Sequence, residues 1–179
     1  KKSIQPHNAK QLADDLVITF HDAAGQPMTD QVITPVGRKM LLKGGKKSGA
    51  FCVIGAKLQA LDTIDRVFMC EGWATGASIR EYYPTVPVIV AIDAGNLIKV
   101  TEAIRTRWAY LPITIFADND RKAEAEERQN IGVESAKAVA NQFLNVSVEV
   151  PVFPNNAPIE YSDFNDLITY RKALAGGDV

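Results

Sequence analysis

Cysteine and histidine are scarce in this chain of 179 residues, which contains two of each. Cys52 and Cys70 are too few and too far apart for a disulfide framework, and neither belongs to a Cys-x-x-Cys pair. With only His7 and His21 as further ligands, a zinc site would have to be assembled from scattered positions. These absences favour a reduced, cytoplasmic setting.

Long hydrophobic runs are also missing. No apolar stretch approaches the length that spans a bilayer, and no signal-peptide pattern opens the chain. We therefore expect no membrane partner. The 46% hydrophobic and 23% charged residues are typical of a globular protein, long enough for one large domain or a domain with an appended lobe. Because the first residue is Lys1 rather than Met, we expect a fragment or a processed product.

Charge is nearly balanced over the whole chain, at −1, but it is unevenly distributed. Residues 1–62 contain nine Lys and Arg against five Asp and Glu, whereas residues 63–179 contain eleven against sixteen. A basic lobe beside an acidic, metal-binding lobe would suit a polyanion whose phosphates are neutralised by cations. Ordinary surface lysines around a hairpin would explain the basic half equally well.

The pattern of elements changes near residue 63. Before it, short apolar runs separated by turns predict a small antiparallel sheet, with strands near residues 16–20, 30–34, 39–42 and 50–54. After it, helical segments alternate with four apolar runs, at residues 67–70, 88–92, 113–117 and 146–150. This alternation predicts an α/β fold with a mostly parallel four-stranded sheet flanked by helices. We expect an N-terminal basic β-rich lobe over residues 1–62 and a catalytic domain over residues 63–179.

Acidic side chains follow two of the predicted buried strands. The run 67–70 ends at Glu71, and the run 113–117 ends at Asp118 and Asp120. Reacting groups gather at the carboxyl ends of parallel strands, so the three carboxylates would converge if the two strands are neighbours. Carboxylates so close together repel each other unless a cation lies between them or one is protonated.

Oxygen ligands of this kind suit Mg²⁺, which typically takes one or two carboxylates together with substrate phosphates. Asp118 and Asp120 are therefore candidate metal ligands, and Glu71 could bind a second ion or act as a general base or acid. Alternatively, the two aspartates only cap the helix that follows them. The matching Glu-Gly at another strand end favours the metal site.

Five further residues are candidates for nucleotide or DNA binding. Gly72 would let the backbone turn sharply next to phosphates, where a side chain would obstruct. Asn96 follows the second strand and faces the same crevice, although capping the next helix would be its more ordinary role. Lys43, Lys46 and Lys47 lie on a glycine-rich hairpin and could hold a triphosphate or the template backbone, or they could be ordinary surface lysines.

The pairing of Glu71-Gly72 with Asp118-Asn119-Asp120, with four strands at the right spacing between residues 67 and 150, resembles the TOPRIM (topoisomerase-primase) domain. Within that superfamily, EGWATG at residues 71–76 is similar to the EGYATA-type motif of primases from conjugative plasmids and phages. Residues 44–51 and 163–166 also resemble segments of that group.

The resemblance implies a DNA primase, a DNA-directed nucleotidyltransferase of DNA replication that joins nucleoside triphosphates on a single-stranded DNA template. It implies that Glu71 is the catalytic general base or a metal-linked acid. Asp118 and Asp120 would bind Mg²⁺ or Mn²⁺, and Asp166 would be an additional acid near the metals. A helicase or mobilisation module would accompany this part in the full-length protein.

Two other functions remain open at this stage. The same acidic residues would serve a metal-dependent nuclease of the TOPRIM superfamily, because the acids alone do not separate polymerisation from hydrolysis. A non-catalytic domain that binds nucleic acid or a replication partner is the third possibility.

Overall fold

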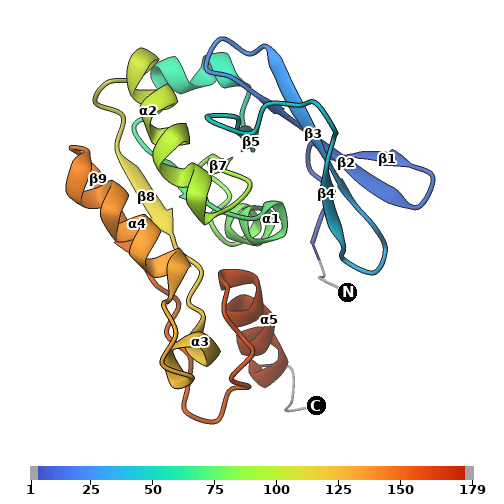
Figure 1. The fold of residues 1–179 in the computed structure, drawn as a ribbon, viewed down its shortest axis with the longest axis vertical. Helices are drawn as coiled ribbons and strands as arrows, with labels where there is room; N and C mark the ends of the chain where they lie inside the picture. Colours follow the sequence, from blue (N-terminus) through green and yellow to red (C-terminus); the bar gives the residue numbers. More distant parts are fainter. Residues whose placement is uncertain (1–3, 176–179) are drawn as a thin grey trace.

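Two β-sheets organise residues 4–175, the part of the chain that the computed structural model describes (Figure 1). The smaller sheet is antiparallel, with the strand order β1-β2-β3-β4. Its strands are β1 (Lys10–Leu12), β2 (Asp15–His21), β3 (Pro27–Ile33) and β4 (Lys39–Leu41). Figure 1 shows this sheet beside the larger one, in blue and cyan.

The larger sheet has the strand order β5-β7-β6-β8-β9. Its strands are β5 (Cys52–Ile54), β6 (Val67–Cys70), β7 (Val88–Val90), β8 (Ile113–Phe116) and β9 (Val146–Glu149). The strands from β6 onward are mutually parallel, and β5 pairs antiparallel with β7 at the edge. The predicted α/β fold, with a parallel-rich sheet and an antiparallel N-terminal sheet, is confirmed.

Helices cover both faces of the larger sheet. The helices within residues 4–175 are η1 (Leu58–Thr63), α1 (Trp73–Tyr82), η2 (Ala94–Asn96), α2 (Leu97–Arg107), α3 (Arg121–Ala125), α4 (Ile131–Gln142) and α5 (Phe164–Ala175). Successive residues of β6 show why the strand is apolar throughout, because Met69 packs in a core with α2 and α4, whereas Phe68 packs with α1 on the opposite face. A strand buried on both faces reads as a continuous apolar run.

The edge strand β5 connects the two sheets. It precedes residue 63, yet it completes the larger sheet rather than the antiparallel one. An isolated bridge between His21 and Phe51 joins the end of β2 to the residue before β5. The sequence of a three-residue strand does not indicate which strand it pairs with. The prediction that residues 50–54 belong to the antiparallel N-terminal sheet was therefore wrong. The division of the chain at residue 62 stays a prediction.

Within residues 4–175, none of the helices combines the length and the apolar composition that crossing a membrane requires.

Candidate active site

The larger sheet brings Glu71 and Asp118 together at the C-terminal ends of its parallel strands. β6 and β8 are neighbours in register, with Cys70 opposite Phe116, so the residues that follow these strands leave the sheet side by side. Both acids line a single cavity of about 1060 Å³, and Gly72 lines it with them. The expected convergence of residues far apart in the sequence is therefore present for this pair.

The N-terminal sheet forms another wall of this cavity. Alternate residues of its strands face the same space, namely Gln31, Ile33, Lys39 and Leu41. The carboxylates that line the cavity are Asp14, Glu71, Asp93, Asp118 and Asp163. Among the described lining residues, Lys39 is the one basic side chain. The cavity is thus strongly acidic, with a single lysine opposite the strand ends.

Glu71 sits in an environment that favours its neutral form. Burial raises the pKa of its carboxyl group to about 7, and the negative charge of Asp93 acts in the same direction. Hydrogen bonding from the backbone of Asp118 and Ala94 and the positive charge of Lys39 act against this increase in pKa. The Oε1 atom is buried and has no hydrogen-bond partner within residues 4–175. A carboxyl group with this pKa can take up and release a proton near neutral pH.

Of the two aspartates that follow β8, Asp118 lines the cavity and Asp120 does not. Asn119 holds the segment after β8 in place, because its backbone N–H donates to Ser162 (2.7 Å) and its side-chain amide donates to the carbonyl of Pro151 (3.1 Å). Asp120 is exposed and caps α3, with Oδ1 accepting the N–H of Ala123 at 2.9 Å. The two-residue alternation holds only inside the strand, which ends at Phe116, and this explains the difference from Asp118.

Asp163, rather than Asp166, lines the cavity near the start of α5. The two acids form a reciprocal cap, in which the N–H of Asp166 donates to Oδ1 of Asp163 (2.8 Å) and that of Asp163 donates to Oδ2 of Asp166 (3.4 Å). The N–H of Ser162 also donates to Oδ2 of Asp166, at 3.1 Å. The hydroxyl of Thr75 donates to the other oxygen of Asp163 at 3.1 Å. Asp163 is therefore an acid that sequence reasoning missed, although the segment Asp163-Phe-Asn-Asp166 contained it.

The predicted lysines lie outside the residues that line the cavity. Lys43 and Lys46 are exposed, and Lys47 forms an ion pair with Asp93, which lines the cavity. The lysine that lines the cavity is instead Lys39, which was not among the three predicted from the sequence. Its Nζ lies 3.4 Å from the position that a Cβ on Gly72 would occupy.

Of the other predicted residues, Asn96 has a structural role, whereas the structure shows no requirement for glycine at position 72. The φ angle of Gly72 is −96°, and a Cβ there would meet only ordinary van der Waals contacts, so neither the turn nor crowding requires glycine. The Asn96 side chain is buried and hydrogen-bonded to three backbone groups. We therefore keep Asn96 out of the proposed nucleotide site.

Gly132, in the first turn of α4, is a glycine that the site does require. A Cβ on it would lie 2.4 Å from the carbonyl oxygen of Asp118 and 2.8 Å from Oε1 of Glu71. Replacing Gly132 by Ala is expected to lower the free energy of unfolding by about 1–3 kcal/mol, because the backbone after β8 must shift. Urea denaturation measures the change.

Gly95→Ala is the matched control, since the nearest atom to its added Cβ would be Asp93 Oδ1, at 3.6 Å. A Gly132→Ala protein no less stable than this control would show that α4 can move away from the acids without cost.

Within residues 4–175, no three His, Cys, Asp or Glu side chains are arranged as a ready metal-binding group. Glu71 and Asp118 form a pair of oxygen donors, and the cavity leaves room beside them for further ligands from a substrate. Mg²⁺ commonly binds in this way, with one or two carboxylates and substrate phosphates. The donor set fits a hard divalent cation without a complete protein cage.

Comparison with known protein families identifies the family to which the chain belongs. A Toprim domain match covers residues 66–173, so this chain belongs to the Toprim family. This confirms the resemblance that the Glu-Gly and Asp-x-Asp motifs had indicated. Toprim primase domains are generally metal-dependent.

Two curated relatives are both DNA primases named TraC, from Escherichia coli. One is 34% identical over 131 residues, covering 71% of this chain and 12% of the relative. The other is 33% identical over 150 residues, covering 84% of this chain and 10% of the relative. The chain therefore spans about a tenth of the length of these relatives.

Solved structures with the same fold include the primase fragment of the bacteriophage T7 primase-helicase protein. Its TM-score is 0.58 at 14% identity, covering 96% of this chain and 65% of that chain. The Escherichia coli primase catalytic core has a TM-score of 0.52 at 11% identity, covering 93% of this chain and 52% of that chain. At these identities the likeness concerns the fold alone.

Proposed function

We propose that this chain is the catalytic core of a DNA primase, which joins nucleoside triphosphates on a single-stranded DNA template. The observation that carries the proposal is the meeting of Glu71 and Asp118, from neighbouring strand ends, in a cavity with Lys39 on its other wall. Membership of the Toprim family and the similarity to the TraC primases support it.

A divalent cation, Mg²⁺ or Mn²⁺, belongs to this proposal. Five carboxylates and one lysine line the cavity, so phosphates would be repelled from it unless cations neutralised the acids. Asp118 would hold the cation, and Glu71 beside it would act as the base. Asp120 and Asp166 would join Asp118 only by leaving the helix caps that they now form.

In the proposed reaction, Glu71 accepts the proton of the 3′-hydroxyl as this oxygen attacks the α-phosphate of the incoming nucleotide. The bond between the α- and β-phosphates breaks in the same displacement, and pyrophosphate leaves. A pKa of about 7 suits a general base near neutral pH, because the group is both partly ionised and basic enough. Lys39 orients the phosphates from the opposite wall. A bound divalent cation would stabilise the charge that develops on the phosphate.

The wider context is part of the same proposal. The substrates place the reaction in the cytoplasm, where the template strand and the nucleotides meet. A helicase or mobilisation module would supply the single-stranded template in the full-length protein. The bacteriophage T7 protein that shares this fold is a fragment of a primase-helicase protein.

Primer synthesis with labelled ribonucleotides, Mg²⁺ and a single-stranded template tests this function. Asp118→Asn is expected to lower the rate at least 100-fold, because it removes a cavity carboxylate. In the proposed complex Asp120 leaves its cap to bind the cation, so Asp120→Asn is expected to lower the rate at least tenfold. The free energy of unfolding should stay unchanged, because asparagine caps a helix as well as aspartate does.

Wild-type activity in Asp120→Asn would show that Asp120 serves only as the cap of α3. Nicking of the DNA without synthesis would replace the primase by a Toprim nuclease. Binding of DNA with neither activity would identify a non-catalytic domain.

A further inference from the structure

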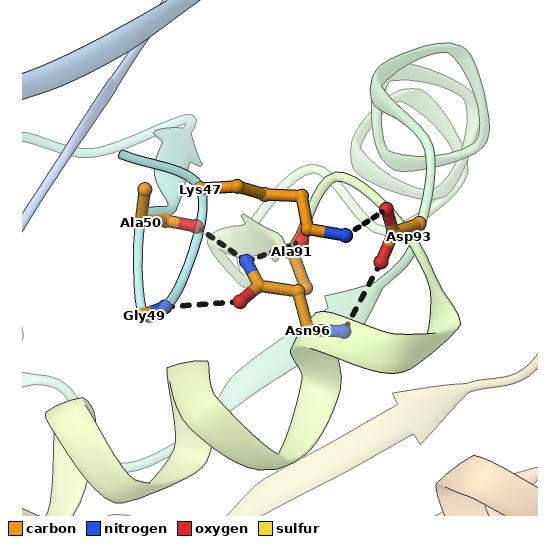
Figure 2. A network of polar contacts seen from close by, with 6 residues as sticks. All are labelled: Lys47, Gly49, Ala50, Ala91, Asp93 and Asn96. Carbon is orange, nitrogen blue, oxygen red and sulfur yellow. Dashed lines mark hydrogen bonds and ion pairs between the residues drawn. The ribbon is translucent and has the colours of Figure 1, made fainter. Parts of the chain in front are cut away.

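Asn96 fixes the loop between β4 and β5 to the end of β7 (Figure 2). Its side-chain Oδ1 accepts the N–H of Gly49 at 2.9 Å, and its Nδ2 donates to the carbonyls of Ala50 (3.0 Å) and Ala91 (2.9 Å). The residue is 1% exposed. Because three backbone groups share one buried amide, the main chain just after Lys47 is held firmly against the larger sheet.

The Lys47 side chain, by contrast, lies at the surface. Figure 2 shows it reaching from this loop towards Asp93, and its Nζ is 2.8 Å from Oδ2 of that residue. The side chains are 44% and 46% exposed, and ion pairs so accessible to water are weak. A stronger anion at the same place would therefore displace the carboxylate from Lys47.

Asp93 takes part in both the ion pair and the cavity. Its Oδ1 accepts the N–H of Asn96 at 3.1 Å, which fixes the carboxylate at the start of η2. The residue lines the cavity together with Glu71 and Asp118. The ammonium group of Lys47 is therefore within hydrogen-bond distance of the cavity wall, with its charge neutralised by a residue of that wall.

We propose that Asp93 is a positioning residue that sets nucleotide affinity by competing with the phosphates for Lys47. When a triphosphate enters, the ammonium group leaves Asp93 and binds a phosphate oxygen, which is a charge-assisted contact of the same kind. Asn96 keeps the main chain in place, so only the end of the lysine side chain moves. The inference rests on the proposed function, and it gives Lys47 a part that Lys43 and Lys46 do not share.

A double-mutant cycle on ATP binding tests this competition, with Kd measured at equilibrium in Mg²⁺ and without template. Asp93→Asn is expected to lower the Kd three- to tenfold, because Lys47 is released while the side-chain oxygen can still accept the Asn96 N–H. Lys47→Met is expected to raise the Kd by a similar factor. In the Lys47→Met background, Asp93→Asn should change the Kd less than twofold. Lys47→Arg should bind ATP within twofold of wild type.

The matched control is Glu102→Gln, which removes the partner of Lys99 from another exposed ion pair of 2.9 Å. Its Kd for ATP should equal that of wild type.

Two outcomes would overturn the inference alone. Weaker binding by Asp93→Asn would mean that the carboxylate itself helps to hold the nucleotide or its cation. Equal tightening with and without Lys47 would mean that Asp93 acts only through the general charge of the cavity. If the wild-type protein bound no ATP and made no primers, the proposed function would fail as well.

Discussion

Replacing Glu71 by Gln is expected to lower the rate of primer synthesis by about 10²–10⁴-fold, the usual contribution of a general base. Glutamine keeps the size of the side chain but cannot accept the proton of the attacking hydroxyl. Steady-state rates measured with labelled ribonucleotides, Mg²⁺ and a single-stranded template give the size of the loss. The fold should persist, because the substitution removes a partly buried charge and adds no bulk.

Glu149→Gln is the matched control for this substitution. Glu149 also lies at the end of a parallel strand, β9, but it is exposed and outside the cavity. Its variant should synthesise primers at the wild-type rate. Equal rates for the two variants would remove Glu71 from the chemistry and leave the proposed mechanism without its base.

Glu71→Gln is also expected to make the protein more stable than the wild type at alkaline pH. The pKa of Glu71 is about 7 in the folded chain, against an ordinary value of 4.5, so the folded state holds the proton more tightly. The stability that this proton provides is complete below pH 4.5 and is lost as the pH rises towards 7. Glutamine stays neutral throughout. The gain in unfolding free energy from Glu71→Gln should therefore be about 2 kcal/mol larger at pH 8 than at pH 5.

Urea denaturation of both proteins at the two pH values, without divalent cations, measures this difference. Glu149→Gln, at an exposed position outside the cavity, is the control at both pH values. A gain from Glu71→Gln that did not grow with pH would show that burial costs the Glu71 carboxylate little.

The parts of the site that could be predicted from the sequence are those that depend on strands. Apolar runs of four or five residues identified β6 and β8, and the acid after each run was Glu71 or Asp118. Because parallel strands present their carboxyl ends at one edge, the meeting of these two acids followed from the order of elements. No knowledge of side-chain packing was needed for that step.

The remaining site residues depend on geometry that local sequence does not encode. Lys39 faces the cavity because β4 pairs with β3 in a register that turns alternate residues toward it. Asp163 lies in the cavity, while Asp166 stabilises the start of α5, and both acids belong to the same short motif. Asp120 follows an irregular segment after β8 rather than the strand itself, so its direction depends on how α3 begins.

The antiparallel edge strand β5 has a consequence for how the Toprim unit can be isolated. Expression of residues 63–179 alone would uncover the outer side of β7, with its row of main-chain donors and acceptors. An exposed edge strand of this kind can pair with strands of other molecules, which leads to aggregation. The segment that carries Cys52–Ile54 covers the outer side of β7, so its removal is expected to promote self-association of the Toprim unit.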